Sequence, residues 1–422
     1  MSSSSAVSDD ELLQAIPPQQ RSDLRRQLDD FLVTQSDTMR PVCLVSSGGT
    51  AVDLDGVRTL ENFSTGLRGA AAVEEFLERG YAVLHLWRTG SAAPFGRVVQ
   101  QQLGLTVANH PLTVESLDRL FAGGGHDDDD IVQTVLQEED DRRRNDYNHS
   151  DDDPLRLHRS LSHSVAVQRA LQQRREAAGR LLTIPFRSVD EYLAKLQLCS
   201  HALHDSATGA LAMFFLAAAV SDFYWPQRSA HKIQSDHEGL SLHLQPVPKV
   251  LARLRRTWAP QAFVVSFKLE TDATILRQKS ERAVERYGCH MVIGNLLQSR
   301  HDQVSILAPT ECNEAHPTSA AAWPTQVVQR EGGDSLEAAL VDVCVQSHLE
   351  FVSYHHHHAN DDDPAAWQQQ QARRVRRKAQ LRRQAFWGKL RDTAIDVSGV
   401  ALALVLSYTI NTVLQRRFRA LQ

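Results

Sequence analysis

The stretch VCLVSSGGT, residues 42–50, joins an apolar run to a glycine-rich turn. This pattern is typical of a buried strand that ends in a tight turn. Two adjacent glycines let backbone N–H groups approach a phosphate closely, although the spacing matches neither the dinucleotide-binding GxGxxG nor the Walker motif. A tight turn without any ligand explains the glycines equally well. The stretch therefore predicts a first parallel strand, and ligands bind such sheets at the carboxyl ends of their strands.

Further apolar runs of strand length alternate with helical patterns along the chain. The expected strands are residues 81–87, 212–220, 262–269, 289–297 and 303–308, and helical periodicity covers residues 69–80, 272–288 and 335–351. Apolar runs bounded by Gly, Pro or charged residues are typical of buried parallel strands. The sequence therefore predicts an α/β fold with a Rossmann-like, doubly wound, mostly parallel sheet and helices on both faces.

Length, charge and cysteine content narrow the class of protein. The chain has 422 residues, enough for one or two globular units, and a formal net charge of -5. Because this charge is small for the length, a general nucleic-acid binder is not expected. The five cysteines are scattered without CxxC pairs, which favours buried thiols in a reducing compartment. The N-terminus lacks the basic and apolar regions of a secretory signal, so we expect a cytoplasmic protein.

Composition divides the chain into four expected parts. Residues 1–38 are a polar leader, 39–354 the main domain, 355–392 a low-complexity basic linker, and 393–422 a hydrophobic C-terminal segment. Residues 123–159 alternate acidic and basic blocks with few large apolar side chains, so we expect a disordered insertion there. Its acidic runs lack the fixed cage that a metal ion needs. The His355–His358 run is interpreted as solvated linker, with a metal site as the alternative.

The C-terminal segment has two interpretations. Residues 397–413 carry no formal charge, and the stretch is at the short limit for a membrane span. Basic residues and Trp387 precede it, as they would beside a membrane anchor. A helix that packs on the main domain or lies along a membrane surface fits the same basic flank. We therefore expect a cytoplasmic protein that this segment could attach to a membrane.

The loop VRTLENFSTGLRG, residues 57–69, combines small residues with an Asn and two arginines. Ser64 and Gly66 stand just before a predicted helix, whose free N–H groups and positive dipole end suit an anion. An ordinary helix N-cap explains the hydroxyl groups as well. It does not explain why Arg58 and Asn62 crowd the same turn.

Further polar residues follow the other predicted strands. Asp222 could accept hydrogen bonds from a substrate or only shape a turn. Lys232 and Lys268 could bind phosphate as point charges, although a solitary loop lysine is usually only solvated. Phe267 could stack on a base or pack in the core. Asn295 lies inside an apolar strand and needs polar partners with or without a ligand.

Taken together and in order, these clusters resemble the eukaryotic phosphopantothenate–cysteine ligases of coenzyme A biosynthesis. The resemblance is carried by SSGGT, VRTLENFSTGLRGAAAVEEFLERGYAVLHLWR, MFFLAAAVSDFYWP, HKIQS, VPKVLARLRRTWAP, FVVSFKLETD and VIGNLL. It extends over residues 40–110 and 180–350 and leaves out the insertion, the leader and the tail. So many matching segments are a poor fit to a chance likeness between Rossmann-like sheets.

The resemblance implies a homodimer that activates the 4'-phosphopantothenate carboxylate with a nucleoside triphosphate and Mg2+. An acyl-nucleotidyl intermediate forms, pyrophosphate leaves, and the amine of L-cysteine attacks. ATP is favoured over CTP because the matching segments are those of the eukaryotic enzymes. The resemblance implies nucleotide binding by Gly48, Ser64, Gly66, Gly69, Phe267 and Asn295, to which the chemistry of Lys232 and Lys268 adds two phosphate ligands. It implies phosphopantothenate binding by Asn62, Ala218, Ala219 and Asp222, with Arg58 from the partner subunit.

Asn62 is the expected catalytic residue. A carboxylate is a poor electrophile, so nucleotidylation supplies a leaving group, and donors must then stabilise the charge that develops on the acyl oxygen. The amide of Asn62 is such a donor, whereas Arg58 has the planar fork that clamps a phosphate. No side chain is expected to be a metal ligand.

Two other classes of function compete with this interpretation. An inactive binding or scaffold protein on the same fold would act through its insertion and basic tail. The intact site clusters argue against it. An NAD-dependent oxidoreductase would carry GxGxxG after the first strand, and that motif is missing here.

Overall fold

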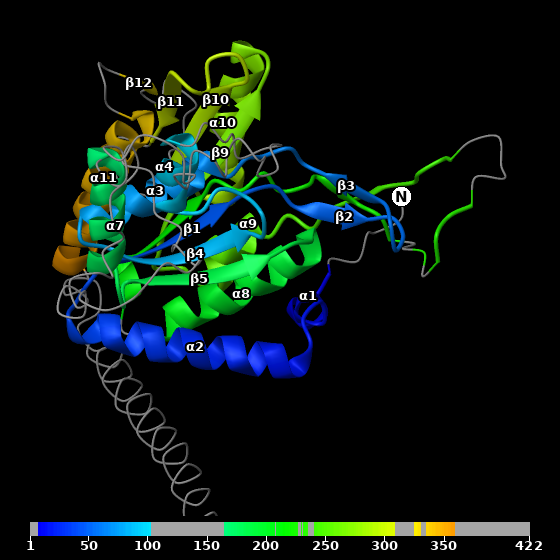
Figure 1. Ribbon diagram of the computed structural model, residues 1–422, viewed down its shortest axis with the longest axis horizontal. Coiled ribbons are helices and arrows are strands. Elements are labelled where there is room, and N and C mark those ends of the chain that lie inside the picture. The colour runs from blue at the N-terminus through cyan, green and yellow to red at the C-terminus, as the bar shows by residue number, and fades with distance from the viewer. Residues whose placement is uncertain are drawn as a thin grey trace, which may run out of the picture.

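The computed structural model describes residues 7–102, 164–206, 208–226, 229, 231–234, 240–308, 325–330 and 335–358 (Figure 1). The expected insertion at 123–159, the expected C-terminal segment at 393–422 and most of the expected linker lie outside these residues. The predictions made for those segments therefore stay predictions.

An eight-stranded sheet runs through the centre of the molecule in the order β12-β11-β10-β9-β6-β1-β4-β5 (Figure 1). Its strands are β1 (Val42–Ser47), β4 (Ala82–Arg88), β5 (Leu181–Phe186), β6 (Ala212–Leu216), β9 (Phe263–Glu270), β10 (Met291–Leu296), β11 (Gln303–Leu307) and β12 (Thr325–Gln329). All pairs from β5 to β10 are parallel. Taken in chain order, these strands lie in the 3-2-1-4-5-6 order of dinucleotide-binding folds. The predicted doubly wound, mostly parallel sheet is confirmed.

The strands differ from the prediction in three respects. The strand expected over 212–220 ends at Leu216, because the chain then leaves the ladder and Ala219 bonds with the loop after β1. Strands β11 and β12 pair antiparallel, so the β10 edge of the sheet is not parallel. Strands β5 and β12 were not predicted.

Helices cover both faces of the sheet. One face carries α8 (Val189–Asp205), α9 (Leu251–Arg253), the π-helical turn η3 (Leu254–Trp258) and α10 (Ala273–Tyr287). The other carries α3 (Leu67–Glu78), α4 (Gly96–Gln102), α7 (Val165–Glu176) and α11 (Leu336–His358), with the short 3-10 turn η2 (Gly209–Leu211) at the start of β6. The side chains of β1 alternate between these two cores, Val42 and Leu44 on the first face and Cys43 and Val45 on the second.

The residues expected as a polar leader form two helices of the folded domain. Helix α1 spans Asp9–Leu13 and helix α2 spans Pro18–Asp37, and α2 packs along α8 (Figure 1). Leu24, Leu28 and Leu32 of α2 are buried in the same core as the strands. Residues 9–37 therefore belong with the domain, because an apolar stripe at helical spacing must be buried.

The boundary expected at residue 354 also falls inside an element. Helix α11 continues to His358, and the His355 ring contacts Phe351 and Tyr354 in it. Within the described part of the chain, no group of three His, Cys, Asp or Glu side chains could hold a metal ion. The helices placed in that same part include none with the length and hydropathy needed to cross a bilayer.

A hairpin projects from the carboxyl end of the sheet. Strands β2 (Ala51–Asp53) and β3 (Thr59–Glu61) pair antiparallel and extend away from the main body in Figure 1. A second small pair, β7 (Phe223–Tyr224) and β8 (Gln245–Pro246), follows β6. Backbone and side-chain bonds tie Ser229 and Ile233 to the turn of the hairpin. We call residues 51–63, 229 and 231–234 the arm.

Candidate functional site

The loops after β1 and β6 meet at the point where the strand order reverses. The Ala219 N–H donates to Gly48 O over 2.8 Å, and the Thr50 N–H donates to Ala219 O over 3.1 Å. The Ala218 N–H donates to the hydroxyl of Ser46, the next-to-last residue of β1, over 3.2 Å. Gly48, Ala218 and Ala219, which the sequence analysis selected, are thus brought together. Open α/β sheets bind their ligands in this crevice.

Asn62 lies at the same crevice, at the base of the arm. Its N–H donates to Thr50 O over 3.2 Å, and its Oδ1 lies 3.4 Å from the Ser221 hydroxyl. Thr50 and Ser221 also bond each other, with 3.0 Å between their hydroxyl oxygens. The Asn62 side chain is exposed, and its Nδ2 donates to none of the residues that the structure describes. The two N–H donors of this amide are therefore not used by the described residues.

The N-terminus of α3 adjoins this loop. Gly66 is the N-cap in the left-handed conformation, with φ of +73°, and no side chain caps the helix. A Cβ on Gly66 would lie 2.9 Å from that of Ser91, and a Cβ on Gly48 would lie 2.2 Å from that of Arg88. The hydroxyls of Ser64 and Thr65 make only long local bonds of 3.4 Å. The first turn of α3 thus keeps N–H groups that an anion can use.

Phe267 and Asn295 face α3 from strands β9 and β10. The Phe267 ring packs edge-on against Phe215, with 4.8 Å between centroids, and is half-buried. Asn295 is only 6% exposed and finds its partners inside the chain. Its Oδ1 accepts from Arg68 Nη1 over 2.7 Å and its Nδ2 donates to Lys268 O over 3.2 Å. Burial lowers the pKa of Arg68.

Lys268 and Asp222 lie toward the opposite face. Lys268 alternates with Phe267 along β9, so its side chain leaves the sheet on the α10 face. Burial lowers the pKa of Lys268. The exposed Asp222 carboxylate accepts from Lys249 Nζ over 2.7 Å. Lys249 was not predicted as a site residue. It lies in VPKVLARLRRTWAP, one of the segments that carry the family resemblance, and this place could have pointed to it.

Arg58 and Lys232 are placed together on the arm, apart from the crevice. Arg58 stands at the turn of the hairpin, four residues of extended chain from Asn62, which corresponds to about 13 Å. Its Nη1 donates to Asp55 Oδ2 over 2.7 Å and to Ile233 O over 2.8 Å. Lys232, the neighbour of Ile233, is exposed. Within a single chain, Arg58 and Lys232 therefore do not lie next to Gly48 and Asn62.

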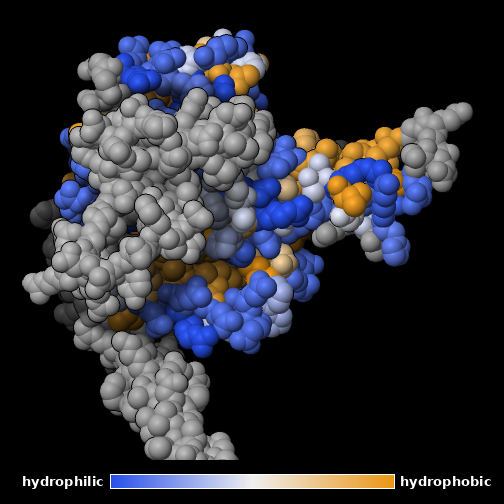
Figure 2. Space-filling view, viewed as in Figure 1, coloured by the Kyte–Doolittle hydropathy of each residue, from blue (hydrophilic) through white to orange (hydrophobic). Residues whose placement is uncertain are grey.

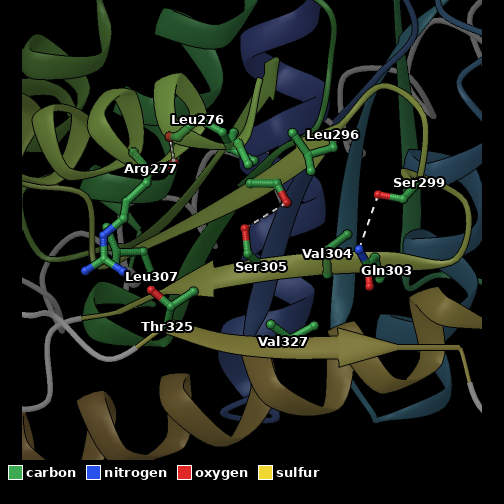
Figure 3. A pocket seen from close by; sticks show the side chains of 13 residues that line it. Leu276, Arg277, Leu296, Ser299, Gln303, Val304, Ser305, Leu307, Thr325 and Val327 are labelled. Carbon is green, nitrogen blue, oxygen red and sulfur yellow. Dashed lines mark hydrogen bonds between the residues drawn. The ribbon is translucent and has the colours of Figure 1, made fainter. Parts of the chain in front are cut away.

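A separate cavity of about 220 Å³ lies between α10 and strands β10–β12 (Figure 3). Gly294 faces α10, so the cavity is on the face of the sheet opposite Asn295. Among its polar groups, Gln303 Nε2 donates to Ser299 Oγ and the Ser305 hydroxyl donates to Gly294 O (Figure 3). Because the cavity lies on the other face of the sheet, we do not include it in the candidate site.

Comparison with known proteins identifies the family. The family model described as "DNA/pantothenate metabolism flavoprotein C-terminal domain" matches residues 40–95 and 197–321. A phosphopantothenate–cysteine ligase of Arabidopsis thaliana is 36% identical over 315 residues, which cover 72% of this chain and 86% of the relative. The human phosphopantothenate–cysteine ligase is 35% identical over 317 residues, covering 74% and 88%. The chain belongs to the phosphopantothenate–cysteine ligase family.

A solved structure agrees with this assignment. A Cab2 mutant in complex with phosphopantothenate-cysteine superposes with a TM-score of 0.62 at 29% sequence identity, covering 82% of this chain and 99% of that chain. The predicted resemblance is confirmed, and the chain is a ligase. The scaffold and oxidoreductase interpretations are therefore not retained.

Proposed function

We propose that the chain ligates 4'-phosphopantothenate with L-cysteine to give 4'-phosphopantothenoylcysteine, using ATP, with CTP as the alternative nucleotide. The observation that carries the proposal is the meeting of Gly48, Ala219 and Asn62 at the crevice where the strand order reverses. The α3 N-terminus opens on the same loop, so a phosphate-binding element and an amide donor adjoin one another.

The nucleotide would lie along the α3 side of the crevice. Its phosphates would take N–H donors from the first turn of α3. Gly48, Gly66 and Gly69 allow the close packing around this turn, because a Cβ there would meet Arg88, Ser91 or Ser47. Ser64 would add a hydroxyl, and Lys268 would add positive charge. Lys232, expected at the same phosphates, instead stands with Arg58 on the arm. The base would stack on Phe267. Asn295 would shape the wall of the base pocket without bonding the base. Its Oδ1 already accepts from Arg68, and its Nδ2 already donates to the Lys268 carbonyl.

Phosphopantothenate would occupy the β6 side of the crevice. Ala218 and Ala219 leave space at the end of β6, and Asp222 would accept hydrogen bonds from the hydroxyl or amide groups of the substrate. Arg58 would clamp its phosphate from the partner subunit's arm. That assignment is supported by the distance along β3, because Arg58 is held at the turn while Asn62 is at the base.

The reaction would proceed in two displacements. A substrate carboxylate oxygen attacks the α-phosphorus of the nucleotide, a P–O bond forms, and the bond to pyrophosphate breaks. The cysteine amine then attacks the acyl carbon, loses a proton, and displaces the nucleoside monophosphate. Asn62 Nδ2 would donate to the acyl oxygen as its negative charge develops.

Mg2+ fits this site as a partner of the phosphates. The described residues offer no three-ligand group, and Mg2+ at nucleotide sites is usually held by one or two carboxylates together with substrate phosphates. The substrate phosphates would hold the ion, since no side chain is expected to be a metal ligand. When bound, the ion neutralises phosphate charge.

The proposal is tested by following pyrophosphate release from the full-length protein with phosphopantothenate, L-cysteine, Mg2+ and either ATP or CTP. We expect release that depends on phosphopantothenate and is faster with ATP. If neither nucleotide supports release, the proposed reaction is wrong. Release with CTP alone would reverse the nucleotide assignment.

Replacing Asn62 tests the chemistry separately. The variant Asn62→Ala should lose about 10²- to 10³-fold in kcat, because one donor to the developing negative charge is removed. The KM for ATP should change little, since Asn62 is placed on the phosphopantothenate side. Steady-state kinetics measure both values. Turnover at the wild-type rate would remove Asn62 from the catalytic role.

Membrane association of the C-terminal segment is tested separately. We propose that residues 397–413 associate the ligase with a membrane, as their length and basic flank favour. Fractionation of cells that contain the full-length protein should then recover it with the membranes. Recovery in the high-speed supernatant without detergent would contradict the anchor.

A further inference from the structure

Asp55 is a buried carboxylate at the turn of the arm hairpin. The residue is 2% exposed. Its Oδ1 accepts the backbone N–H groups of Val57 and Arg58 over 2.8 and 2.7 Å. Its Oδ2 accepts Arg58 Nη1 over 2.7 Å and the Ile233 N–H over 3.0 Å. The hydrogen bond from the Ile233 N–H, with those from Val57 and Arg58, lowers the pKa of Asp55 to about 2.

These bonds connect two segments that are distant in the sequence. The Ile233 carbonyl accepts Arg58 Nη1 while the Ile233 N–H donates to Asp55, so the residue beside Lys232 is bound on both sides of its backbone. The Ser229 N–H adds a bond to Leu54 O over 3.1 Å. One carboxylate thus binds both the Arg58 side chain and the backbone of the residue that follows Lys232.

The bonds also leave one edge of the Arg58 guanidinium for a ligand. Both of its side-chain bonds to described residues use Nη1. The Nε and Nη2 donors form the other edge, and this pair is the fork that binds two oxygens of a phosphate or carboxylate. The Arg58 side chain is 37% exposed, so that edge can reach solvent.

We propose that Asp55 is a positioning residue that holds Arg58 and Lys232 as a paired cationic clamp for the phosphate of phosphopantothenate. The clamp rests on the proposed function, and it assigns Lys232 to the same anion as Arg58. Asp55 itself touches no substrate. It acts by fixing the guanidinium and the Lys232 segment before the substrate binds, which lowers the ordering cost of binding.

The variant Asp55→Asn tests the clamp. Its Oδ1 can still accept the two turn N–H groups, but an amide Nδ2 would face the Arg58 Nη1 and Ile233 donors. We expect the dissociation constant for phosphopantothenate, measured by calorimetry on the full-length protein, to rise about 10- to 100-fold. The constant for ATP and the kcat at saturating phosphopantothenate should stay within about 3-fold.

A matched control lies on the same hairpin. Asp53 pairs with Arg187 over 2.8 Å, so Asp53→Asn also breaks a carboxylate–arginine pair of the arm. It should leave phosphopantothenate binding within about 2-fold. If Asp53→Asn weakens binding as much as Asp55→Asn, the effect is a general loosening of the arm and the clamp is wrong.

A background variant separates positioning from stability. In Arg58→Ala/Lys232→Ala protein the clamp is gone, so adding Asp55→Asn should weaken binding no further. A further loss of the same size would overturn the proposal. If Asp55→Asn does not fold, Asp55→Ser replaces it in the same binding measurement. The serine hydroxyl keeps one acceptor for the turn N–H groups and leaves none for Arg58 Nη1. Equal binding by wild type and Asp55→Asn overturns the clamp alone, whereas a wild type that does not bind phosphopantothenate overturns the proposed function with it.

Discussion

Gly69 lets the first turn of α3 lie directly on the end of β1. A Cβ at this position would fall 2.1 Å from Ser47 Cβ, far inside van der Waals contact. Gly69→Ala should therefore lower the free energy of unfolding by about 1–3 kcal/mol and raise the KM for ATP, because α3 must move away from the loop. Urea unfolding and steady-state kinetics measure the two effects. Gly96→Ala is the control, since its Cβ would meet only Ala93 Cβ at 3.8 Å.

Single residues show which parts of the candidate site can be predicted from the local sequence. Asn295 stood out because a polar residue inside an apolar strand needs partners, and the structure supplies them in Arg68 and Lys268. The sequence could not say that those partners come from α3 and β9, because that depends on strand order. Lys249 and Asp55 were missed for the same reason: each gains significance only from a partner across the fold, Asp222 or Ile233.

Helix α2 shows the same limit at the scale of an element. Its polar composition suggested a leader, yet Leu24, Leu28 and Leu32 repeat every four residues and face α8. The spacing of these leucines indicates a buried helix face. The leader was predicted from the polar composition of the segment, which does not register spacing. The long strands β1, β4 and β9 were predictable because buried parallel strands are apolar throughout. The short arm strands were not, since their pairing depends on turn geometry.

Removing one leucine tests whether α2 belongs to the fold. Leu28 is fully buried, so Leu28→Ala should reduce the free energy of unfolding by about 2–5 kcal/mol. The neighbouring Gln27 is exposed, and Gln27→Ala should change it by no more than about 0.5 kcal/mol. Denaturant unfolding of both variants decides the matter. Equal effects would mean that α2 is an appended leader after all.

The whole molecule should lose stability in mild acid because its core holds neutral histidines. Burial lowers the pKa of His348 to about 4 and that of His85 to about 3, from an ordinary value of 6.5. Between about pH 6.5 and 4 the unfolded chain takes up protons that the folded chain does not, so the free energy of unfolding falls as pH falls.

A variant of His348 isolates one of these protons. His348 lies between the Tyr81 hydroxyl and the Ala210 carbonyl, 2.8 and 3.0 Å away. In His348→Gln the decline of unfolding free energy between pH 6.5 and 4.5 should be shallower by up to about 1.4 kcal/mol per pH unit. Urea titrations across this range measure the slope. An unchanged slope would show that His348 is not excluded from protonation in the fold.

At the scale of the assembly, we propose a homodimer in which the arm of each chain completes the other's site. Val57, Leu60 and Phe63 are 68%, 39% and 75% exposed on the arm, and Figure 2 shows hydrophobic residues over this projecting part. Exposed apolar patches of this kind mark interaction surfaces. Arg58 is held at the turn of the same arm, so a shared site would take Arg58 from one chain and Asn62 from the other.

Mixed dimers test this arrangement directly. In a dimer of one Asn62→Ala chain and one Arg58→Ala chain, a shared site would combine the intact Asn62 of one chain with the intact Arg58 of the other. An equal mixture should recover about a quarter of wild-type kcat with the wild-type KM for phosphopantothenate. A control mixture of Asn62→Ala/Arg58→Ala with Arg58→Ala has no such site and should recover nothing at low substrate. If both mixtures behave alike, Arg58 serves its own chain and the arm does not complete the partner's site.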